Sequence, residues 1–169
     1  MVNLITPGLR SAALFLLLSI AFILYSVWYT KNRKILTIRN IPALDAIEEA
    51  VGRCAEMGKP LHFSSGVGGL TNQWAPLTVA SMSLLGHTAR LAGEKGIDMR
   101  YATTQPYLIP MAEDLIRSGY VAAGHEELYH SGMATFVGND QKALMADVSG
   151  YLVREQAAAN LLFGAIFWE

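Results

Sequence analysis

The sequence predicts an α/β fold in which a single transmembrane helix precedes a Rossmann-like, mostly parallel sheet with covering helices. Two observations predict it. Residues 11–30 are twenty consecutive positions without a charged side chain, the length that a helix needs to cross the roughly 30 Å hydrocarbon core of a bilayer. In the remainder, short apolar segments alternate with helical segments at intervals of about 25 to 40 residues, as in parallel sheets with helical crossovers.

The uncharged segment has the flanks of an uncleaved membrane anchor. Arg10 precedes it and Lys31 follows it. Aromatic rings, which favour the membrane interface, gather near Lys31, namely Tyr25, Trp28 and Tyr29. The side chains of residues 26–30 are too bulky for the small-residue cleavage site of a signal peptide. We therefore expect residues 11–30 to span the membrane once.

Basic residues are distributed unequally around this segment. Arg10 stands alone on the N-terminal side, whereas Lys31, Arg33, Lys34 and Arg39 follow the segment. Because Lys and Arg are retained in the cytoplasm, we expect the N-terminus to lie outside and residues 31–169 to lie in the cytoplasm. The single cysteine fits a reducing compartment, since it has no partner for an internal disulfide.

Composition divides the chain into a short tail (1–10), a transmembrane helix (11–30), a basic juxtamembrane linker (31–41) and an α/β domain (42–169). The formal net charge is −1, so the chain lacks the basic field that nucleic-acid binding needs, and we expect no nucleic-acid partner. The basic residues of the linker fit anionic lipid headgroups instead. Membrane lipid is therefore an expected partner.

The first half of the domain contains a helix, a strand and a second helix. The first helix begins at Pro42 and ends before Gly58, and its apolar residues recur at spacings of three and four: Leu44, Ile47, Val51 and Cys54. A strand over residues 61–65 follows and runs into a glycine cluster. Residues 74–92 are predicted to be helical, because Pro76 lies in the first turn and glycines follow the last.

The second half continues the alternation. We expect strands over residues 97–103, 134–137 and 160–167. Helices are expected from Pro106 to about Gly119 and over residues 141–156, and residues 120–132 are expected to form a loop or a broken helix. Glycine, proline and short polar residues separate these segments, as turn chemistry requires.

The carboxyl ends of the predicted strands are small and polar, and ligands of α/β sheets bind beyond these ends. The candidate ligand-binding residues are Ser64, Ser65, Gly66, Gly68, Gly69, Thr103, Thr104, Asn139 and Asp140. A nucleotide or another small anion would be the natural ligand. The alternative is that these residues only turn the chain and cap helices. The dinucleotide-binding fingerprint is incomplete, because Thr71 stands where its third glycine belongs.

No set of residues indicates catalysis or metal binding. His125 and His130 are five positions apart, which on a helix separates them by about 140°. Ser65 lacks the flanking glycines of a hydrolase nucleophile. His62, in a strand, and His87, on an apolar helix, are expected to be packed core histidines. We therefore predict no catalytic residue and no metal site, and the sequence points to no particular cofactor.

The segment 74–89 contains no charged residue and many small ones. A helix that covers one face of a sheet normally shows a polar stripe to water. We therefore expect this helix to be covered on its second side by a partner, in a homo-oligomer or with other membrane subunits, through Val79, Met82 and Gly86. The uncharged segment 160–168 also suggests that further polypeptide completes the sheet.

Three segments carry a resemblance to a known family. They are IRNIPALDAIEEA (residues 38–50), HFSSGVGGL (62–70) and REQAAAN (154–160). Over residues 36–169 the chain resembles an uncharacterised prokaryotic family of membrane-anchored α/β domains. The resemblance implies an anchor with a soluble domain, implies that the polypeptide continues past residue 169, and brings no assigned chemistry.

Two functions remain open from the sequence. The first is a membrane-anchored structural or accessory subunit that assembles through its α/β domain. The second is an α/β domain, with or without enzymatic activity, that binds a nucleotide or another small anionic ligand at the strand ends. The uncharged helix and the absence of a catalytic set favour the first.

Overall fold

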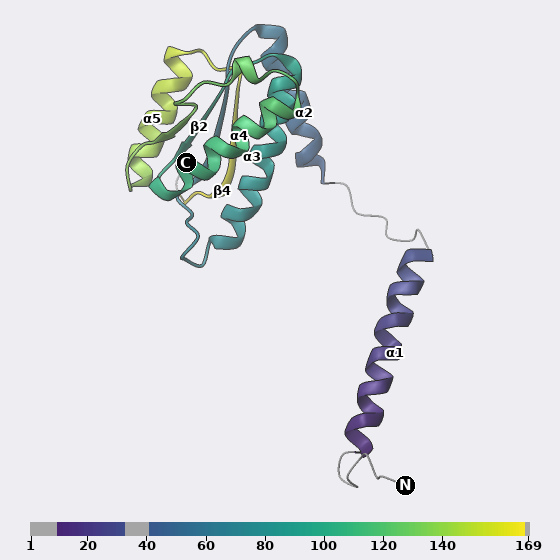
Figure 1. Ribbon diagram of the computed structural model, residues 1–169. Helices are drawn as coiled ribbons and strands as arrows, with labels where there is room; N and C mark the ends of the chain where they lie inside the picture. Colours follow the sequence, from purple (N-terminus) through teal and green to yellow (C-terminus); the bar gives the residue numbers. More distant parts are fainter. Residues whose placement is uncertain (1–9, 33–40, 168–169) are drawn as a thin grey trace. The chain divides into compact units, whose positions relative to one another are not determined.

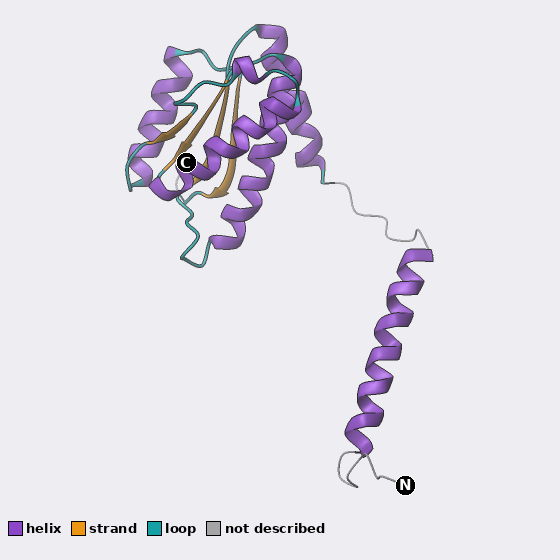
Figure 2. Ribbon diagram, in the orientation of Figure 1, coloured by secondary structure: helices purple, strands orange, loops and turns teal. Residues whose placement is uncertain are grey.

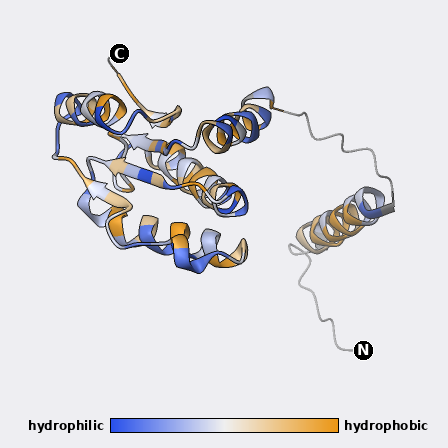
Figure 3. Ribbon diagram, turned by 90° about the horizontal axis from the view of Figure 1, so that it is seen from above, coloured by the Kyte–Doolittle hydropathy of each residue, from blue (hydrophilic) through white to orange (hydrophobic). Residues whose placement is uncertain are grey.

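The computed structural model describes residues 10–32 and 41–167 (Figure 1). The chain divides after Asn40 into two units, each described here by itself. The first unit contains helix α1, Arg10–Asn32. Within it, Ser11–Lys31 contains eighteen consecutive residues with a mean hydropathy of 2.1, and it is the one helix of the described part that is long and apolar enough to cross a membrane (Figure 3).

Two hydroxyl side chains of helix α1 form hydrogen bonds within the helix. Ser19 and Thr30 donate hydrogen bonds to the carbonyls of Phe15 and Ser26, one turn earlier in the helix, at 2.9 and 2.8 Å. This is what an apolar surrounding requires, because hydrocarbon offers no hydrogen-bond partner. The ring of Tyr25 lies 6.3 Å from that of Trp28 and 6.0 Å from that of Tyr29, between ring centroids. The predicted aromatic cluster therefore forms one patch near the end of the helix.

The second unit is built on a parallel sheet of four strands, as the sequence predicts (Figure 2). The strands are β1 Leu61–Gly66, β2 Met99–Thr103, β3 Ala134–Phe136 and β4 Ala159–Ala165. Their order is β3-β2-β1-β4, and all three neighbouring pairs are parallel. Strand order therefore reverses between β1 and β4, and this junction is where α/β proteins usually place a ligand.

Helix α2 precedes the first strand, and three further helices and two short 3-10 turns connect the strands. The helices are α2 Pro42–Met57, α3 Ala75–Lys95, α4 Ile109–Ala122 and α5 Gln141–Arg154, and the turns are η2 Pro106–Leu108 and η3 Glu126–Leu128. Gly58 and Gly96 end α2 and α3 in the left-handed conformation, with φ of +61° and +67°. Glycine adopts this conformation without a steric cost, which explains both helix ends.

The sheet is covered unequally on its two faces. Residues of α2, α3 and α4 form the larger core with the first face, around Phe63 and Tyr101. Of the described helices, α5 alone covers the second face, where Leu144 and Val148 pack on Ala102. Alternate residues of a strand point to opposite faces, so His62, Arg100 and Asn160 belong to the α5 side.

Small residues bring α3 close to a neighbour, but that neighbour is α4 of the same chain. A methyl group added at Gly119 would lie 2.7 Å from Ala89 Cβ, and one added at Gly93 would lie 2.8 Å from Ala123 Cβ. Gly86 faces Leu115 of α4. The low polarity of α3 is thus explained in part by packing within the chain.

The three predicted interface residues of α3 lie in different surroundings. Met82 is buried in the chain's own core, so the prediction that it contacts a partner does not hold. Gly86 is partly covered by α4. Val79 remains 54 % exposed, and it is the residue of the three that a partner could reach.

Candidate functional site at the carboxyl ends of the strands

The hydroxyls at the ends of β1 and β2 form a buried cluster. Ser65 Oγ lies 2.6 Å from the hydroxyl oxygen of Tyr101 and donates to Thr103 Oγ1 at 3.5 Å. All three side chains are fully buried. Burial raises the pKa of Tyr101, although the hydrogen bonds with Ser65 and Thr103 oppose the rise, so the phenol stays neutral near pH 7. The structure thus brings Ser65 and Thr103 together, beneath α3 and α4 and away from solvent.

Backbone amides of the glycine cluster donate hydrogen bonds within the chain. An anion-binding loop would present them to its ligand instead. The donors and acceptors are Gly66 to Ser64 Oγ at 3.1 Å, Val67 to the Ala165 carbonyl at 2.9 Å, Gly69 to Asn72 Oδ1 at 3.4 Å and Leu70 to the Tyr107 hydroxyl at 3.1 Å. These four amides serve to shape the loop and to join it to β4 and η2.

Strands β1 and β4 touch at the point where strand order reverses. Gly66 has φ of +71°, and a methyl group there would overlap the carbonyl of Ala165. Gly164 has φ of +140°, and a methyl group there would overlap the carbonyl of Ser65. The two glycines therefore permit backbone contact between the strand ends, at the junction that usually accepts a ligand.

The remaining predicted site residues lie beyond the ends of β2 and β3. Asn139 and Asp140 are exposed and follow β3, which is separated from β1 by β2. Thr104 is buried, and Gln105 connects it to the glycine cluster by donating to Thr104 Oγ1 at 3.4 Å and to the Val67 carbonyl at 3.3 Å. Sequence reasoning missed Gln105, because this contact depends on the positions of two loops.

Gly68 has a packing role against α3. A methyl group at this position would lie 2.6 Å from Thr78 Oγ1 and 3.5 Å from Trp74 Cβ. A bulky side chain would therefore displace the start of α3, so loss of ligand binding on such a substitution would not distinguish a ligand site from a structural turn.

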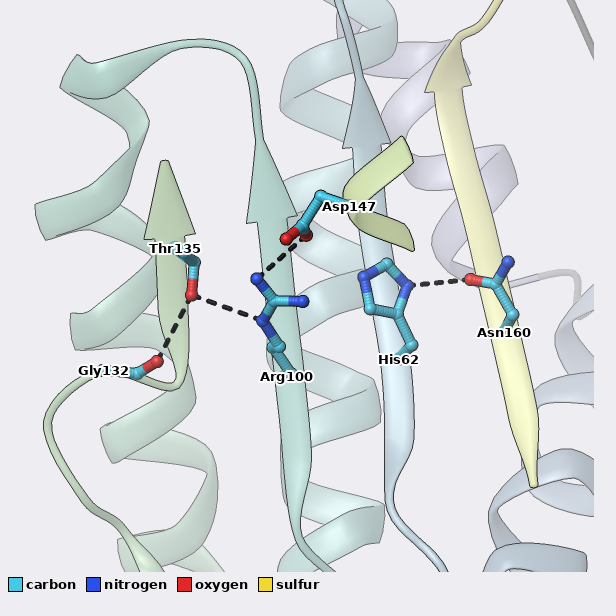
Figure 4. Close-up of polar contacts among 6 residues, drawn as sticks. All are labelled: His62, Arg100, Gly132, Thr135, Asp147 and Asn160. Atoms are coloured by element: carbon cyan, nitrogen blue, oxygen red, sulfur yellow. Dashed lines mark hydrogen bonds and ion pairs between the residues drawn. The ribbon is translucent and has the colours of Figure 1, made fainter. Parts of the chain in front are cut away.

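A second polar cluster, which the sequence did not reveal, lies between the sheet and α5 (Figure 4). We call it the cross-sheet cluster. It consists of His62, Arg100, Thr135, Asp147, Tyr151 and Asn160. Residues of all four strands take part. His62 of β1 pairs in register with Arg100 of β2 and with Asn160 of β4, and Thr135 belongs to β3. Finding it requires the register, which the sequence alone does not provide.

The cross-sheet cluster is held by short polar contacts. His62 Nδ1 lies 2.8 Å from Asn160 Oδ1, and Arg100 Nη2 lies 2.9 Å from Asp147 Oδ2. Arg100 Nε also donates to Thr135 Oγ1 at 3.4 Å. The Tyr151 ring contacts both Arg100 and His62, with its centroid 4.7 Å from Arg100 Cζ and 5.5 Å from the His62 ring centroid. Burial lowers the pKa of His62, so its imidazole is neutral near pH 7.

The other histidines lie on the surface. His87 is exposed, so the prediction of a core position, correct for His62, is wrong for this residue because it lies on the outer side of α3. His125 contacts Glu127 at 2.9 Å, and His130 contacts Asp98 at 3.4 Å. Within residues 10–32 and 41–167, no group of three or more His, Cys, Asp or Glu residues is placed to hold a metal ion.

A comparison with protein families covers nearly the whole chain. The sequence matches the profile of a domain of unknown function, DUF6754, over residues 3–169. The chain belongs to the DUF6754 family. This agrees with the resemblance to an uncharacterised family and extends it through the apolar helix α1. No curated protein and no solved structure matches this DUF6754 chain.

The chemistry of the DUF6754 site is limited by burial. Its hydroxyl cluster contains no group that titrates near neutral pH, since Ser65, Tyr101 and Thr103 are all neutral. The one histidine that is buried in the α/β unit, His62, lies on the opposite face of the sheet from this cluster. The described residues therefore do not unite a nucleophile with a base at the strand ends.

Proposed function

We propose that this chain is a membrane-anchored structural or accessory subunit that assembles into an oligomer or a larger membrane complex through its α/β domain. The observation that carries the proposal is the edge strand β4. It is seven residues long and, among the described residues, pairs on one side only, with β1. No charged residue occurs from position 157 to position 168.

An uncharged edge strand is a surface for pairing with another polypeptide. Soluble proteins normally protect such edges with charged residues, proline or very short strands. The opposite edge of this sheet follows that rule, because β3 has only three residues. In β4, Leu162 is 42 % exposed on the α5 side of the sheet, and Phe167 beyond the strand is 51 % exposed. A strand or helix of a partner would bury this surface.

The anchor supports the same function. We propose that α1 spans the membrane with the N-terminus outside, and that the α/β domain lies in the cytoplasm next to anionic lipid headgroups. An anchor confines copies and partners to one membrane, which raises their effective concentration and makes a small contact surface sufficient. Val79 and Leu77, 54 % and 45 % exposed on α3, offer a second apolar contact.

Substitution of Leu162 tests the proposal. We expect Leu162→Lys in the full chain, extracted with native lipid, to weaken assembly at least about tenfold, because a lysine would be desolvated at the new contact (about 1.4 kcal/mol). Val153→Lys is the matched control, since Val153 is an exposed apolar residue of α5. The proposal is contradicted if both variants assemble like the wild type. If Val79→Lys loses assembly and Leu162→Lys does not, the assembly contact lies on α3 and not on β4.

Ligand binding at the glycine cluster predicts a different result. A nucleotide at one hundred times its Kd would stabilise the folded state by about 2.7 kcal/mol, which raises the Tm by several degrees. Because four amides of the cluster donate within the chain, we expect millimolar ATP, NAD or phosphate to leave the Tm unchanged. A saturable rise would favour the ligand-binding alternative over assembly alone.

A further inference from the structure

His62 lies at the centre of the contacts that hold the second face of the sheet together. It belongs to the central strand β1, and its ring is fully buried. One nitrogen, Nδ1, contacts Asn160 of the edge strand β4. The face of the ring packs on Tyr151 of α5, and Arg100 occupies the opposite register position on β2. One imidazole therefore contacts or adjoins three separate elements (Figure 4).

Only the neutral imidazole suits this position. With Asn160 Oδ1 as acceptor, Nδ1 carries the proton, and the second nitrogen, Nε2, is buried without a hydrogen-bond partner among the described residues. A second proton would bind at Nε2 and would place a positive charge there, next to the guanidinium of Arg100. Burying an unpaired charge in this way is costly.

The neighbouring carboxylate offers limited compensation. The charged or titratable groups that face His62 are Arg100 of β2 and Asp147 and Tyr151 of α5, and β4 contributes the neutral Asn160. Asp147 already pairs with Arg100 at 2.9 Å. Two cations would then share one carboxylate. At His62 the repulsion by Arg100 exceeds the attraction by Asp147, so the carboxylate does not offset a second positive charge.

We propose that His62 is a proton-sensitive lock, and that its protonation at mildly acidic pH loosens β4 and α5 from the sheet. The lock acts on the strand that carries the proposed assembly surface, but the inference does not depend on assembly. It rests on the contacts around the imidazole and would hold in an isolated chain.

The direction of the pH dependence follows from linkage. The pKa of His62 is lowered in the folded state, mainly by burial. An opened state in which water reaches the ring therefore binds the proton more tightly. The stabilising effect of neutral His62 is fully present above the unfolded value, about 6.5, and is lost as the pH falls below it. One proton changes the opening equilibrium by at most about tenfold per pH unit.

Hydrogen exchange of the full chain in lipid discs tests the lock. We expect the opening equilibrium of the β4 amides, corrected for intrinsic exchange, to rise between pH 7 and pH 5.5 by up to about tenfold per pH unit. In His62→Gln, whose amide keeps an N–H donor for Asn160 but does not titrate, this rise should vanish. His87→Gln, at an exposed histidine of α3, should retain it. Persistence of the rise in His62→Gln, or its absence from the wild type, would overturn the proposal.

A direct titration covers the case in which His62→Gln does not fold. The chain has four histidines, and the other three are exposed. The triple variant His87→Gln, His125→Gln, His130→Gln, purified without a histidine tag, therefore leaves His62 as the single imidazole. We expect its NMR titration to give a pKa below 6.5. A value at or above 6.5 would show that the folded state tolerates the second proton and would refute the lock.

Discussion

Replacing Gly164 with alanine should lower the free energy of unfolding of the α/β unit by about 3 kcal/mol or more. Gly164 has φ of +140°, and its added methyl group would overlap the carbonyl of Ser65. Backbone strain of about 1–3 kcal/mol adds to an overpacking cost of similar size. Urea unfolding of the full chain in detergent, followed by circular dichroism, measures the loss.

The control for this prediction separates strain from crowding. Gly124 also has a positive φ, +81°, but nothing lies within 4 Å of an added methyl group. Gly124→Ala should therefore cost only about 1 kcal/mol, from backbone strain alone. Equal losses in the two variants would mean that β1 and β4 do not touch where strand order reverses. The junction would then have room for a ligand, and the ligand-binding alternative would regain support.

Removing the carboxylate of the cross-sheet cluster should have the second large effect. Asp147→Ala leaves Arg100 without its ion-pair partner, and the side chains of Arg100 and Asp147 are only 16 % and 22 % exposed. Breaking a fully buried pair costs about 3–5 kcal/mol, so we expect a loss of about 2–3 kcal/mol at this partly solvated pair. Urea unfolding at pH 7 measures it.

Two further variants show whether the unpaired charge causes this loss. Arg100→Met combined with Asp147→Ala should recover much of the stability, because no buried charge then lacks a partner. Glu126→Ala breaks an exposed ion pair of the same length, with Arg117 at 2.9 Å, and should change the free energy of unfolding little. If Asp147→Ala behaves like Glu126→Ala, the cross-sheet cluster does not contribute to stability.

The elements that the sequence predicts well are those with a strong local signal. The apolar spacing from Leu44 to Cys54 and the glycine after it predict α2. Short apolar segments between turn residues predict all four strands, although β2 begins at Met99, two positions later than expected. The uncharged length of α1 identifies a helix that could cross a membrane. These features depend on neighbours in the sequence, so no tertiary information is needed.

The candidate site was harder to predict, because its properties depend on register and contact. The positions of Ser65 and Thr103 at strand ends are correct, but their burial follows from the packing of α3 and α4 above them. A glycine at position 66 predicts a turn, but it does not predict the acceptor of its backbone amide, which could be an anion and is Ser64 Oγ in the structure. Only the structure shows that Gly164 meets β1 at this junction.

The neighbours of α3 also could not be predicted from the sequence. The small residues of this helix predicted a close neighbour, and a close neighbour is present. Composition could not say that α4 of the same chain fills that place, because helix pairing within a chain is a tertiary property. It also left open that Met82 points into the core while Val79 points outward.

The mass of the intact particle tests the central claim, assembly through the α/β domain, most directly. The full chain, extracted in native lipid discs and weighed by native mass spectrometry, should give a protein mass well above the 18.4 kDa of one chain. Leu162→Lys should reduce that mass to 18.4 kDa, and Val153→Lys should leave it unchanged. A wild-type mass of one chain at every protein concentration would contradict the account.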